Sequence, residues 1–322
     1  MFSASSQSDG ARFEIHYKSS TNLVYRPTTI VRARNVVVAA GVLGTIDLLL
    51  KCRNEIRTLP KISARLGESV RTNSEAFLGA FSKKENIDNS KGLAITSIIQ
   101  ADATTQVEPL RFPEDSSLLF RLLAAPFIET HGGFLRRLGE VLVGYIKELP
   151  QSINTKFISG LTRRGIGLMV MQTENNQLNL IRGRSIFTFF RRGLVTIPDP
   201  EKTIPTNTKL GHRIAKEVAN ELGGEPIGTL METLVKVPMT AHMLGGAAFG
   251  RDENEGVIDL DCQVFNYPGL YIVDGSIVPA NPGINPSLTI TALAEYAMSR
   301  VPPKEDASIR KPIGTSATLH NQ

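Results

Sequence analysis

The 322-residue sequence lacks the features that mark secreted, metal-binding or membrane-spanning proteins. Its two cysteines, Cys52 and Cys262, form no disulfide framework and lack the spacing of a metal site, so we expect a reducing compartment. Residues 1–10 hold no apolar run of the kind found in a signal peptide. The longest apolar stretch, 36–50, is interrupted by polar residues and is too short to cross a bilayer. These absences predict a cytoplasmic protein or one peripheral to a membrane.

Charge and composition are those of an ordinary folded protein. The net charge is +5 at pH 7, 41% of the residues are hydrophobic and 21% are charged, which excludes disordered and fibrous classes. Basic residues occur as scattered arginine pairs without aromatic residues between them, so we expect no nucleic-acid partner. A weak attraction to anionic lipid or to an acidic protein stays open. The length allows one large core or two modest ones.

The amino-terminal part predicts half of a nucleotide-binding unit. Residues 13–17 alternate between apolar and polar, which indicates a strand, and 28–32 could return as its hairpin partner. Residues 36–40 form a continuous apolar strand of the kind buried on both faces in a parallel sheet. Gly41 ends that strand and 45–51 predicts a helix, so the glycine turn between them would let backbone amides approach a ligand.

The remainder of the chain predicts mixed strands, loops and helices. The expected elements are a hairpin centred on 174–176, a helix over 210–222, a buried strand over 270–273, a helix from Pro286 or Ser287 to about Arg300, and a mobile tail beyond 302. Another helix carries an apolar stripe formed by Phe134, Leu138, Val141, Leu142 and Tyr145. Such a stripe is typical of a helix that faces the core. With Arg136 and Arg137 beside it, the stripe could also touch a bilayer surface.

His242 is the first residue that predicts chemistry. It is one of five histidines and stands just before the pair Gly245-Gly246. A backbone with two glycines can pass close to a flat ring and present the imidazole to it. Histidine is also the side chain best matched to proton transfer near neutral pH. The alternative is a structural or solvent-facing histidine.

A second segment combines the end of a strand with the start of a helix. Asp274 and Gly275 follow the buried strand, where an acidic residue can bond a sugar-like hydroxyl and a glycine amide can lie near a cofactor. The same dipeptide could be a simple turn. Asn285, Pro286 and Ser287 open the next helix, whose positive end favours an anionic ring. Asn285 cannot both cap this helix fully and hold a substrate.

Glu108 is the third candidate for chemistry. It stands directly before Pro109 and therefore in extended backbone. Asp102, Glu114 and Asp115 lie nearby in the sequence, and we expect them to be surface charges. Glu108 itself could also face solvent.

Together these motifs resemble the GMC (glucose-methanol-choline) oxidoreductases, and within them the cholesterol oxidase branch. The resemblance is carried by residues 35–53 with Leu59-Pro60 after them, 239–250 and 267–300, and more loosely by 101–109. Its most specific parts are His-x-Leu-Gly-Gly at 242–246 and Asp-Gly-Ser followed by Asn-Pro at 274–286.

The resemblance implies a mixed α/β (α+β) fold, with a partial Rossmann-like FAD-binding domain and a substrate domain built from a mixed or antiparallel sheet and helices. It implies FAD as cofactor, a bulky apolar alcohol such as a sterol or steroid as substrate, and oxygen or another electron acceptor. Hydride would pass from the carbinol carbon to the flavin while the hydroxyl proton leaves through His242 or a water it holds. Asn285 would contact substrate and the flavin edge, and Glu108 would move protons in sterol isomerisation.

Candidate FAD contacts follow from the same resemblance. Gly275, Asn285 and Ser287 match positions that line FAD, and Asp274 follows from Gly275. Gly41 and Pro286 complete this set from the motifs described above: Gly41 in the glycine turn and Pro286 at the helix start. The family often has proline and cysteine where this chain has Met243 and Ala247, so neither covalent attachment nor a cysteine role is supported there.

The family's Gly-x-Gly-x-x-Gly fingerprint, the main anchor of the FAD pyrophosphate, is missing from the sequence. We therefore expect the carboxyl-terminal part of a longer protein, from a truncated or split gene, and a targeting signal upstream of Met1 stays open. The expected domains are an incomplete FAD-binding domain over 1–90, a substrate domain over 91–245, a closing segment of the FAD-binding domain over 246–302 and a tail over 303–322. The alternative is an inactive fragment, or a subunit whose partner carries the Gly-rich loop.

Overall fold

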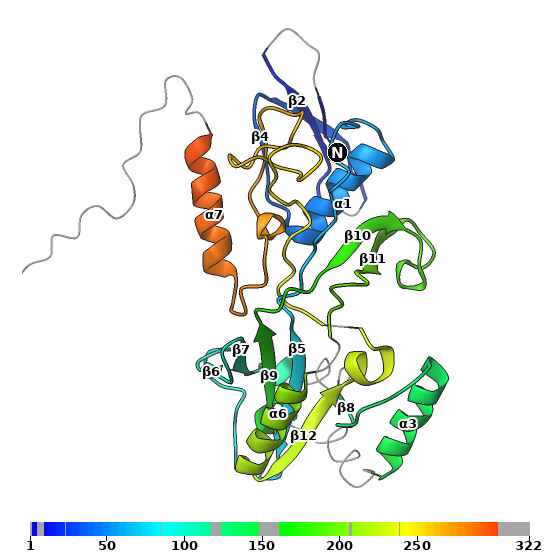
Figure 1. Ribbon diagram of the computed structural model, residues 1–322, viewed down its shortest axis with the longest axis vertical. Coiled ribbons are helices and arrows are strands. Elements are labelled where there is room, and N and C mark those ends of the chain that lie inside the picture. The colour runs from blue at the N-terminus through cyan, green and yellow to red at the C-terminus, as the bar shows by residue number, and fades with distance from the viewer. Residues whose placement is uncertain are drawn as a thin grey trace, which may run out of the picture.

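The structure is a computed structural model that describes residues 2–4, 10–22, 24–84, 86–116, 124–147, 161–205, 208–237 and 239–301. Figure 1 shows two lobes that meet at a narrow region crossed by several chain segments. The tail predicted beyond residue 302 lies outside the described residues.

The first lobe contains β1 (Phe2–Ala4), β2 (Phe13–Tyr17), β3 (Thr29–Ala33), β4 (Val36–Val38), α1 (Gly41–Asn54), β13 (Leu270–Ile272), the 3-10 turn Gly275–Ile277 and α7 (Ser287–Arg300). The second lobe contains β5 (Ala76–Ser82), β6 (Ile99–Gln100), β7 (Thr105–Leu110), β8 (Ala124–Ala125), α3 (Phe134–Lys147), α5 (Leu161–Arg164), β9 (Gly165–Gln172), α6 (Lys209–Glu221) and β12 (Gly224–Thr229), with the 3-10 turn Glu114–Ser116 and the π-helical turn Met231–Val235. Between them lie β10 (Leu178–Gly183), the 3-10 turn Ile186–Thr188 and β11 (Gly193–Pro198).

The strands of the first lobe follow the sequence pattern in part. β2 pairs with β3 in antiparallel fashion, with Ile15 opposite Val31, which confirms the predicted hairpin partner. β4 pairs in parallel with β13, with Val37 opposite Tyr271. The prediction that β4 is buried on both faces is wrong, because the Val37 side chain is 40% exposed. Within the described residues β13 is the only strand beside β4.

Helix α1 begins at Gly41, four residues before the predicted helix 45–51. Gly41 adopts a φ of +70°, which lets the chain turn sharply out of β4 and enter the helix at once. The buried face of α1 includes Ile46 and Leu49, which pack into the core of the first lobe together with Ile272 of β13. The glycine turn is thus part of the helix rather than a separate loop.

A six-stranded antiparallel sheet in the order β6-β7-β9-β5-β12-β8 forms the second lobe. On one face of this sheet, Leu78, Val107 and Val170 pack against Ile214 and Ala215 of α6. Helix α6 confirms the predicted helix 210–222 within a residue at either end. The apolar stripe of α6 is therefore what covers this face of the sheet.

Two predictions about chain organisation differ from the structure. The predicted hairpin around 174–176 is wrong: β9 lies between β5 and β7, whereas β10 pairs with β11. Segment 173–177 instead connects the two regions of the chain. The predicted domain boundary at residue 90 also differs from the topology, because β5 already belongs to the sheet of the second lobe.

The apolar stripe of α3 is divided between core and surface. Val141 is buried, and the hydroxyl of half-buried Tyr145 donates to the carbonyl oxygen of Ala124 at 3.1 Å. Phe134 and Leu142 are exposed. One side of the stripe therefore faces the lobe, as predicted for a core helix, and the other side is open. Every helix that the structure describes is too short or too polar to cross a bilayer.

Candidate functional site

Glu108 and Asn285 come together although 177 positions separate them. Glu108 lies on β7 and is 1% exposed, so the solvent-facing alternative is wrong. Both of its carboxylate oxygens accept from Nδ2 of Asn285, each at 2.9 Å. Asp102 and Glu114 are exposed, as expected for surface charges. The structure thus selects one carboxylate from this region and pairs it with the candidate asparagine.

Asn285 does not cap α7. The helix begins at Ser287 after Pro286, and no side chain bonds its first amides among the described residues. The first helical hydrogen bond runs from the Ile290 amide to the Pro286 carbonyl oxygen at 2.8 Å. The conflict between capping and substrate binding is removed, because the Asn285 amide points to Glu108. The positive end of α7 remains open to an anionic group.

His242 is held by a residue that the sequence did not reveal. Its Nδ1 atom is in hydrogen-bond contact with the Glu75 carboxylate, whose second oxygen accepts from the Ala241 amide at 2.7 Å. The His242 side chain is 19% exposed and that of Glu75 is fully buried. Glu75 closes the sequence Thr-Asn-Ser-Glu at 72–75, which has the composition of a turn and gave no signal of burial.

The pair Gly245-Gly246 serves packing inside the chain. Gly245 has a φ of +71°, and a Cβ there would lie 2.3 Å from the Ser69 carbonyl oxygen. Gly246 has a φ of +99°, and its Cβ would lie 3.0 Å from both Ile46 and Val70. The glycines allow segment 244–246 to lie against 69–71 and α1. This close approach between chain segments accounts for the pair without a flat ring.

Asp274 forms the turn that the sequence offered as the alternative to a sugar contact. One oxygen accepts from the amide and the hydroxyl of Ser276, at 2.9 and 2.6 Å, and the other accepts from the Thr45 hydroxyl. Asp274 is buried, at 7% exposure. Its contact with FAD stays a prediction, as does that of Gly275.

Three observations fit the residues to part of an FAD site. A Cβ at Gly41 would meet nothing within 4 Å, so its backbone borders open space. A Cβ at Gly275 would lie 3.2 Å from the Met243 carbonyl oxygen, so this position lies directly against the histidine segment. The uncapped start of α7 at Ser287 adds backbone donors. The described residues contain no group of three or more His, Cys, Asp or Glu arranged to hold a metal ion.

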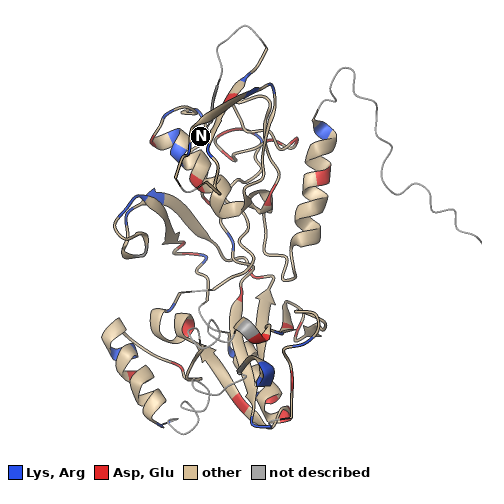
Figure 2. Cartoon of the chain, turned by 180° about the vertical axis from the view of Figure 1, so that it is seen from behind, with Lys and Arg blue, Asp and Glu red and all other residues tan. Residues whose placement is uncertain are grey.

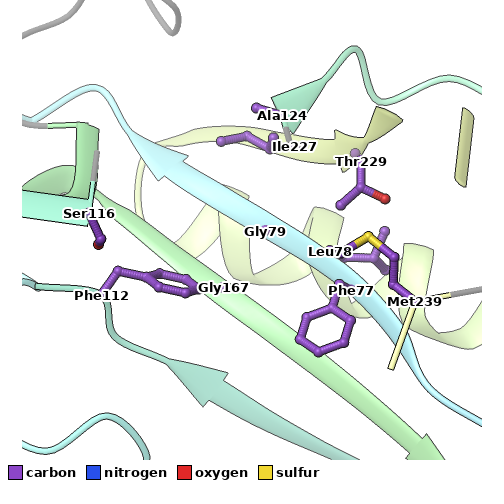
Figure 3. A pocket seen from close by; sticks show the side chains of 11 residues that line it. Phe77, Leu78, Gly79, Phe112, Ser116, Ala124, Gly167, Ile227, Thr229 and Met239 are labelled. Atoms are coloured by element: carbon purple, nitrogen blue, oxygen red, sulfur yellow. The ribbon is translucent and has the colours of Figure 1, made fainter. Parts of the chain in front are cut away.

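An apolar pocket lies on the sheet of the second lobe, with a volume of about 560 Å³ that includes space open to solvent (Figure 3). It is lined by Phe77, Leu78, Gly79, Phe112, Ser116, Ala124, Gly167, Ile227, Gly228, Thr229 and Met239. In Figure 3 the Phe112 ring lies beside Gly167, and Gly79 carries no side chain into the space. A Cβ at Gly167 would lie 2.8 Å from the Phe112 ring. The two glycines therefore keep the centre of the pocket floor bare.

The register of the sheet places Glu108 on the same face as this pocket. Glu108 is opposite Met169, and Met169 is opposite Phe77. Directly opposed residues point to one face of a sheet, and so do residues two apart along a strand. Phe77 and Gly79 line the pocket, so Glu108 shares its face, while α6 covers the other face.

Comparison with known proteins finds a matching family model for part of the chain and two similar proteins. Residues 199–294 match the family described as GMC oxidoreductase. The chain is 35% identical over 300 residues to a cholesterol oxidase of Acinetobacter baumannii, covering 92% of this chain and 52% of that protein. It is 35% identical over 318 residues to a cholesterol oxidase of Mycobacterium tuberculosis (strain ATCC 25618 / H37Rv), covering 96% and 53%. The chain thus spans about half the length of these curated relatives.

A solved structure gives the fold. Pyridoxine 4-oxidase from Mesorbium loti matches with a TM-score of 0.52 at 12% identity, over 91% of this chain and 55% of that chain. At this identity the match concerns the fold alone. The mixed α/β architecture expected from the sequence is confirmed at that level. Residues 199–294 thus match the carboxyl-terminal domain of the GMC oxidoreductases, and the chain is homologous to cholesterol oxidases over about half of their length.

Proposed function

We propose that the chain is the carboxyl-terminal part of an FAD-dependent oxidoreductase that acts on the CH–OH group of a bulky apolar alcohol of the sterol class. The observation that carries the proposal is the contact between buried Glu108, on the pocket face of the sheet, and half-buried Asn285. A sterol is apolar except for its hydroxyl, so it needs an apolar pocket with few polar groups. The two cholesterol oxidases, at 35% identity, support the same substrate class.

Some of the candidate residues would bind FAD and the substrate, and one would transfer a proton. FAD, when bound, supplies the acceptor for the hydride that leaves the carbinol carbon. Gly41, Gly275 and the Ser287 amide would hold FAD, and Asn285 would contact both its edge and the substrate. His242 would orient the hydroxyl and accept its proton, directly or through a water. Oxygen or another electron acceptor would be the second substrate.

Flavin retention is the primary test of this proposal. The purified chain is mixed with FAD, freed of excess, and its visible spectrum is recorded. Retained flavin, followed by oxidation of cholesterol that His242→Ala abolishes, would support the proposal. Retained flavin without oxidation of any sterol alcohol would refute the substrate class.

Binding of a fluorescent sterol to the chain tests the pocket separately from FAD. Gly167→Leu would fill the pocket floor, because even a Cβ would lie 2.8 Å from the Phe112 ring. The matched control is Gly139→Leu on α3, where a Cβ would meet nothing within 4 Å. We expect sterol binding to be lost in the first variant alone, and equal binding by both would place the sterol elsewhere.

The exposed apolar surface of the first lobe favours a second candidate function, that of a subunit completed by another polypeptide. Leu288 on α7 is 80% exposed, and Leu43 on α1 is 50% exposed. Glu295 and Arg300 are the only charged residues of α7, which Figure 2 shows as a largely tan helix. Parallel strands such as β4 and β13 are normally covered on both faces. We propose that a chain carrying the Gly-rich FAD loop covers these surfaces.

Complementation separates the two candidates. The chain is co-expressed with the amino-terminal half of the Acinetobacter baumannii cholesterol oxidase, and the complex is purified through a tag on this chain. A chain that is colourless alone and binds flavin in the complex would support the subunit. A chain that binds FAD alone and does not retain the second polypeptide would refute it.

A further inference from the structure

We propose that Glu75 is a positioning residue that fixes the orientation and the tautomer of His242, and that Asn73 ties this ring to the segment that carries Asn285. The chemical use of His242 rests on the proposed function, but the positioning does not. The inference follows from a buried set of contacts around the turn 72–75, which joins the two lobes of the chain just before β5.

The contacts of Glu75 determine which nitrogen of His242 carries hydrogen. Glu75 is fully buried, and both of its oxygens face hydrogen-bond donors. One oxygen accepts from the Ala241 amide at 2.7 Å, and the other contacts Nδ1 of His242. An ionised carboxylate only accepts, so Nδ1 must donate. In the neutral ring Nε2 then keeps its lone pair, which is the form that a proton acceptor needs.

Asn73 links this carboxylate to the second half of the site. Its Nδ2 atom lies 3.4 Å from the nearer oxygen of Glu75 and donates to the Ile284 carbonyl oxygen at 3.0 Å. Its Oδ1 atom accepts from the Gly283 amide at 2.9 Å. One side chain therefore spans from Glu75 to the two residues before Asn285. His242 and Asn285, which come from different loops, are held through a shared turn.

The backbone of this turn is strained. Asn73 and Ser74 have φ values of +55° and +47°, in the left-handed region that non-glycine residues rarely occupy. A residue in this region persists where its surroundings over-determine its backbone conformation. Here the Ser74 hydroxyl accepts from Nδ2 of Asn176 at 2.8 Å. The strained turn directs the side chains of Asn73 and Glu75 to neighbouring groups.

The chain offers an internal control for this pair. In the second lobe, Nε2 of His212 lies 2.8 Å from a carboxylate oxygen of Glu232. The ring of His212 lies beside that of Phe127, with centroids 4.8 Å apart, and His212 lines a pocket that contains none of the candidate site residues. Nδ1 of His212 lies 4.0 Å from the Glu129 carboxylate, so the nearer carboxylate is that of Glu232 at Nε2, and we expect His212 to favour the other tautomer from His242. One sample therefore contains two glutamate–histidine pairs in which different ring nitrogens face the carboxylate, and the tautomer of each can be measured.

The test is an NMR measurement of histidine tautomers in the flavin-free chain. With the five histidines labelled with ¹⁵N, long-range ¹H–¹⁵N spectra distinguish Nδ1-protonated from Nε2-protonated rings, and His242→Gln assigns the relevant signal. We expect His242 to be protonated at Nδ1. A wild-type ring that carries hydrogen on Nε2 alone would overturn the proposal without any variant. Because no cofactor or substrate is involved, this result is independent of the proposed function.

Three variants sharpen the result. Glu75→Gln replaces one acceptor atom with a donor, so the side chain cannot accept from both Nδ1 and the Ala241 amide. We expect the single-tautomer signal of His242 to be lost, whereas Glu75→Asp, which keeps two acceptors, should retain it. Glu232→Gln should change the signal of His212 alone. A His242 signal in Glu75→Gln that matches wild type would refute the positioning role.

The link through Asn73 is read from backbone amides. Asn73→Asp replaces the Nδ2 donor with an acceptor that faces the carbonyl oxygen of Ile284 and the carboxylate of Glu75. We expect shifts of the Gly283 and Ile284 amides together with the His242 signal. Shifts confined to Gly283 and Ile284 would show that Asn73 supports only the segment that carries Asn285. That result would overturn the proposal that one turn holds both His242 and Asn285.

Discussion

Exchanging the carboxylate of Glu108 and the carboxamide of Asn285 tests whether the contact between the two side chains contributes a coupling energy to stability. In Asn285→Asp, a second carboxylate faces the buried carboxylate of Glu108, so two hydrogen bonds of 2.9 Å are lost and two like charges meet. In Glu108→Gln, the side chains can still form one amide–amide hydrogen bond after a flip. In the double variant, donor and acceptor are exchanged and the two-oxygen contact can form again.

The expected magnitudes follow from these contacts. A hydrogen bond to a charged group contributes about 1.5–3 kcal/mol, so Asn285→Asp should lower the free energy of unfolding by about 3 kcal/mol at pH 7. Glu108→Gln should lower it by about 1–2 kcal/mol. The double variant should regain a coupling energy of about 2–3 kcal/mol. For Asn285→Asp, the loss corresponds to a fall in Tm of about 6–12 °C.

Thermal unfolding followed by circular dichroism at pH 7 and pH 5 measures these effects. The loss in Asn285→Asp should be smaller at pH 5, because the folded state then binds a proton that lets one carboxyl donate to the other. Glu217→Gln, at an exposed carboxylate on α6, is the control and should stay within about 0.5 kcal/mol of wild type. A double variant destabilised by the sum of the two single changes would show that the contact is not an energetic unit.

Three further predictions concern packing and reactivity. Gly139→Ala should stabilise α3 by about 0.5–1 kcal/mol, because a Cβ there meets nothing within 4 Å. Gly144→Ala should destabilise the protein, because its Cβ would lie 2.9 Å from a neighbouring side chain, and Tm measurements compare the two variants. Leu142→Asp should leave Tm unchanged and reduce sedimentation with anionic liposomes if the open side of α3 touches a membrane, whereas Val141→Asp should unfold the buried side. Burial and two nearby aspartates raise the pKa of Cys262 to about 11, so this thiol should resist a disulfide reagent at pH 8 until urea unfolds the chain.

Local sequence pattern was sufficient to predict strands whose pairing partner is adjacent in the sequence and helices whose apolar residues recur at a clear helical period. The strand at 13–17 and its return, and the helices at 210–222 and 286–300, formed as predicted because alternation and helical spacing record which side is buried. The hairpin around 174–176 failed for the opposite reason. Alternation in β9 and β10 shows that each has a buried face, but the strands that pair with them lie far away in the sequence.

The sequence named residues of the candidate site but did not predict the contacts between them. Local pattern made Glu108, His242 and Asn285 candidates and the family resemblance gave them roles, but their sequence gives no distance between them. That Asn285 bonds Glu108 rather than capping α7 depends on how the sheet meets the returning chain. Glu75 was missed altogether, because a polar tetrapeptide before a strand looks like a surface turn.

Burial of charge explains why these connections matter for the whole chain. Glu75 and Glu108 lie on β-strands or at their ends in the second lobe, and each is about 1% exposed. A buried carboxylate is costly unless donors surround it, and both sets of donors come from the returning segment that carries His242 and Asn285. The sheet therefore supplies the acids and the returning chain supplies the histidine and the amide. Separating the two would remove the Asn285 donor from Glu108 and the His242 and Ala241 donors from Glu75, so stable packing of the lobes and assembly of the site are one event.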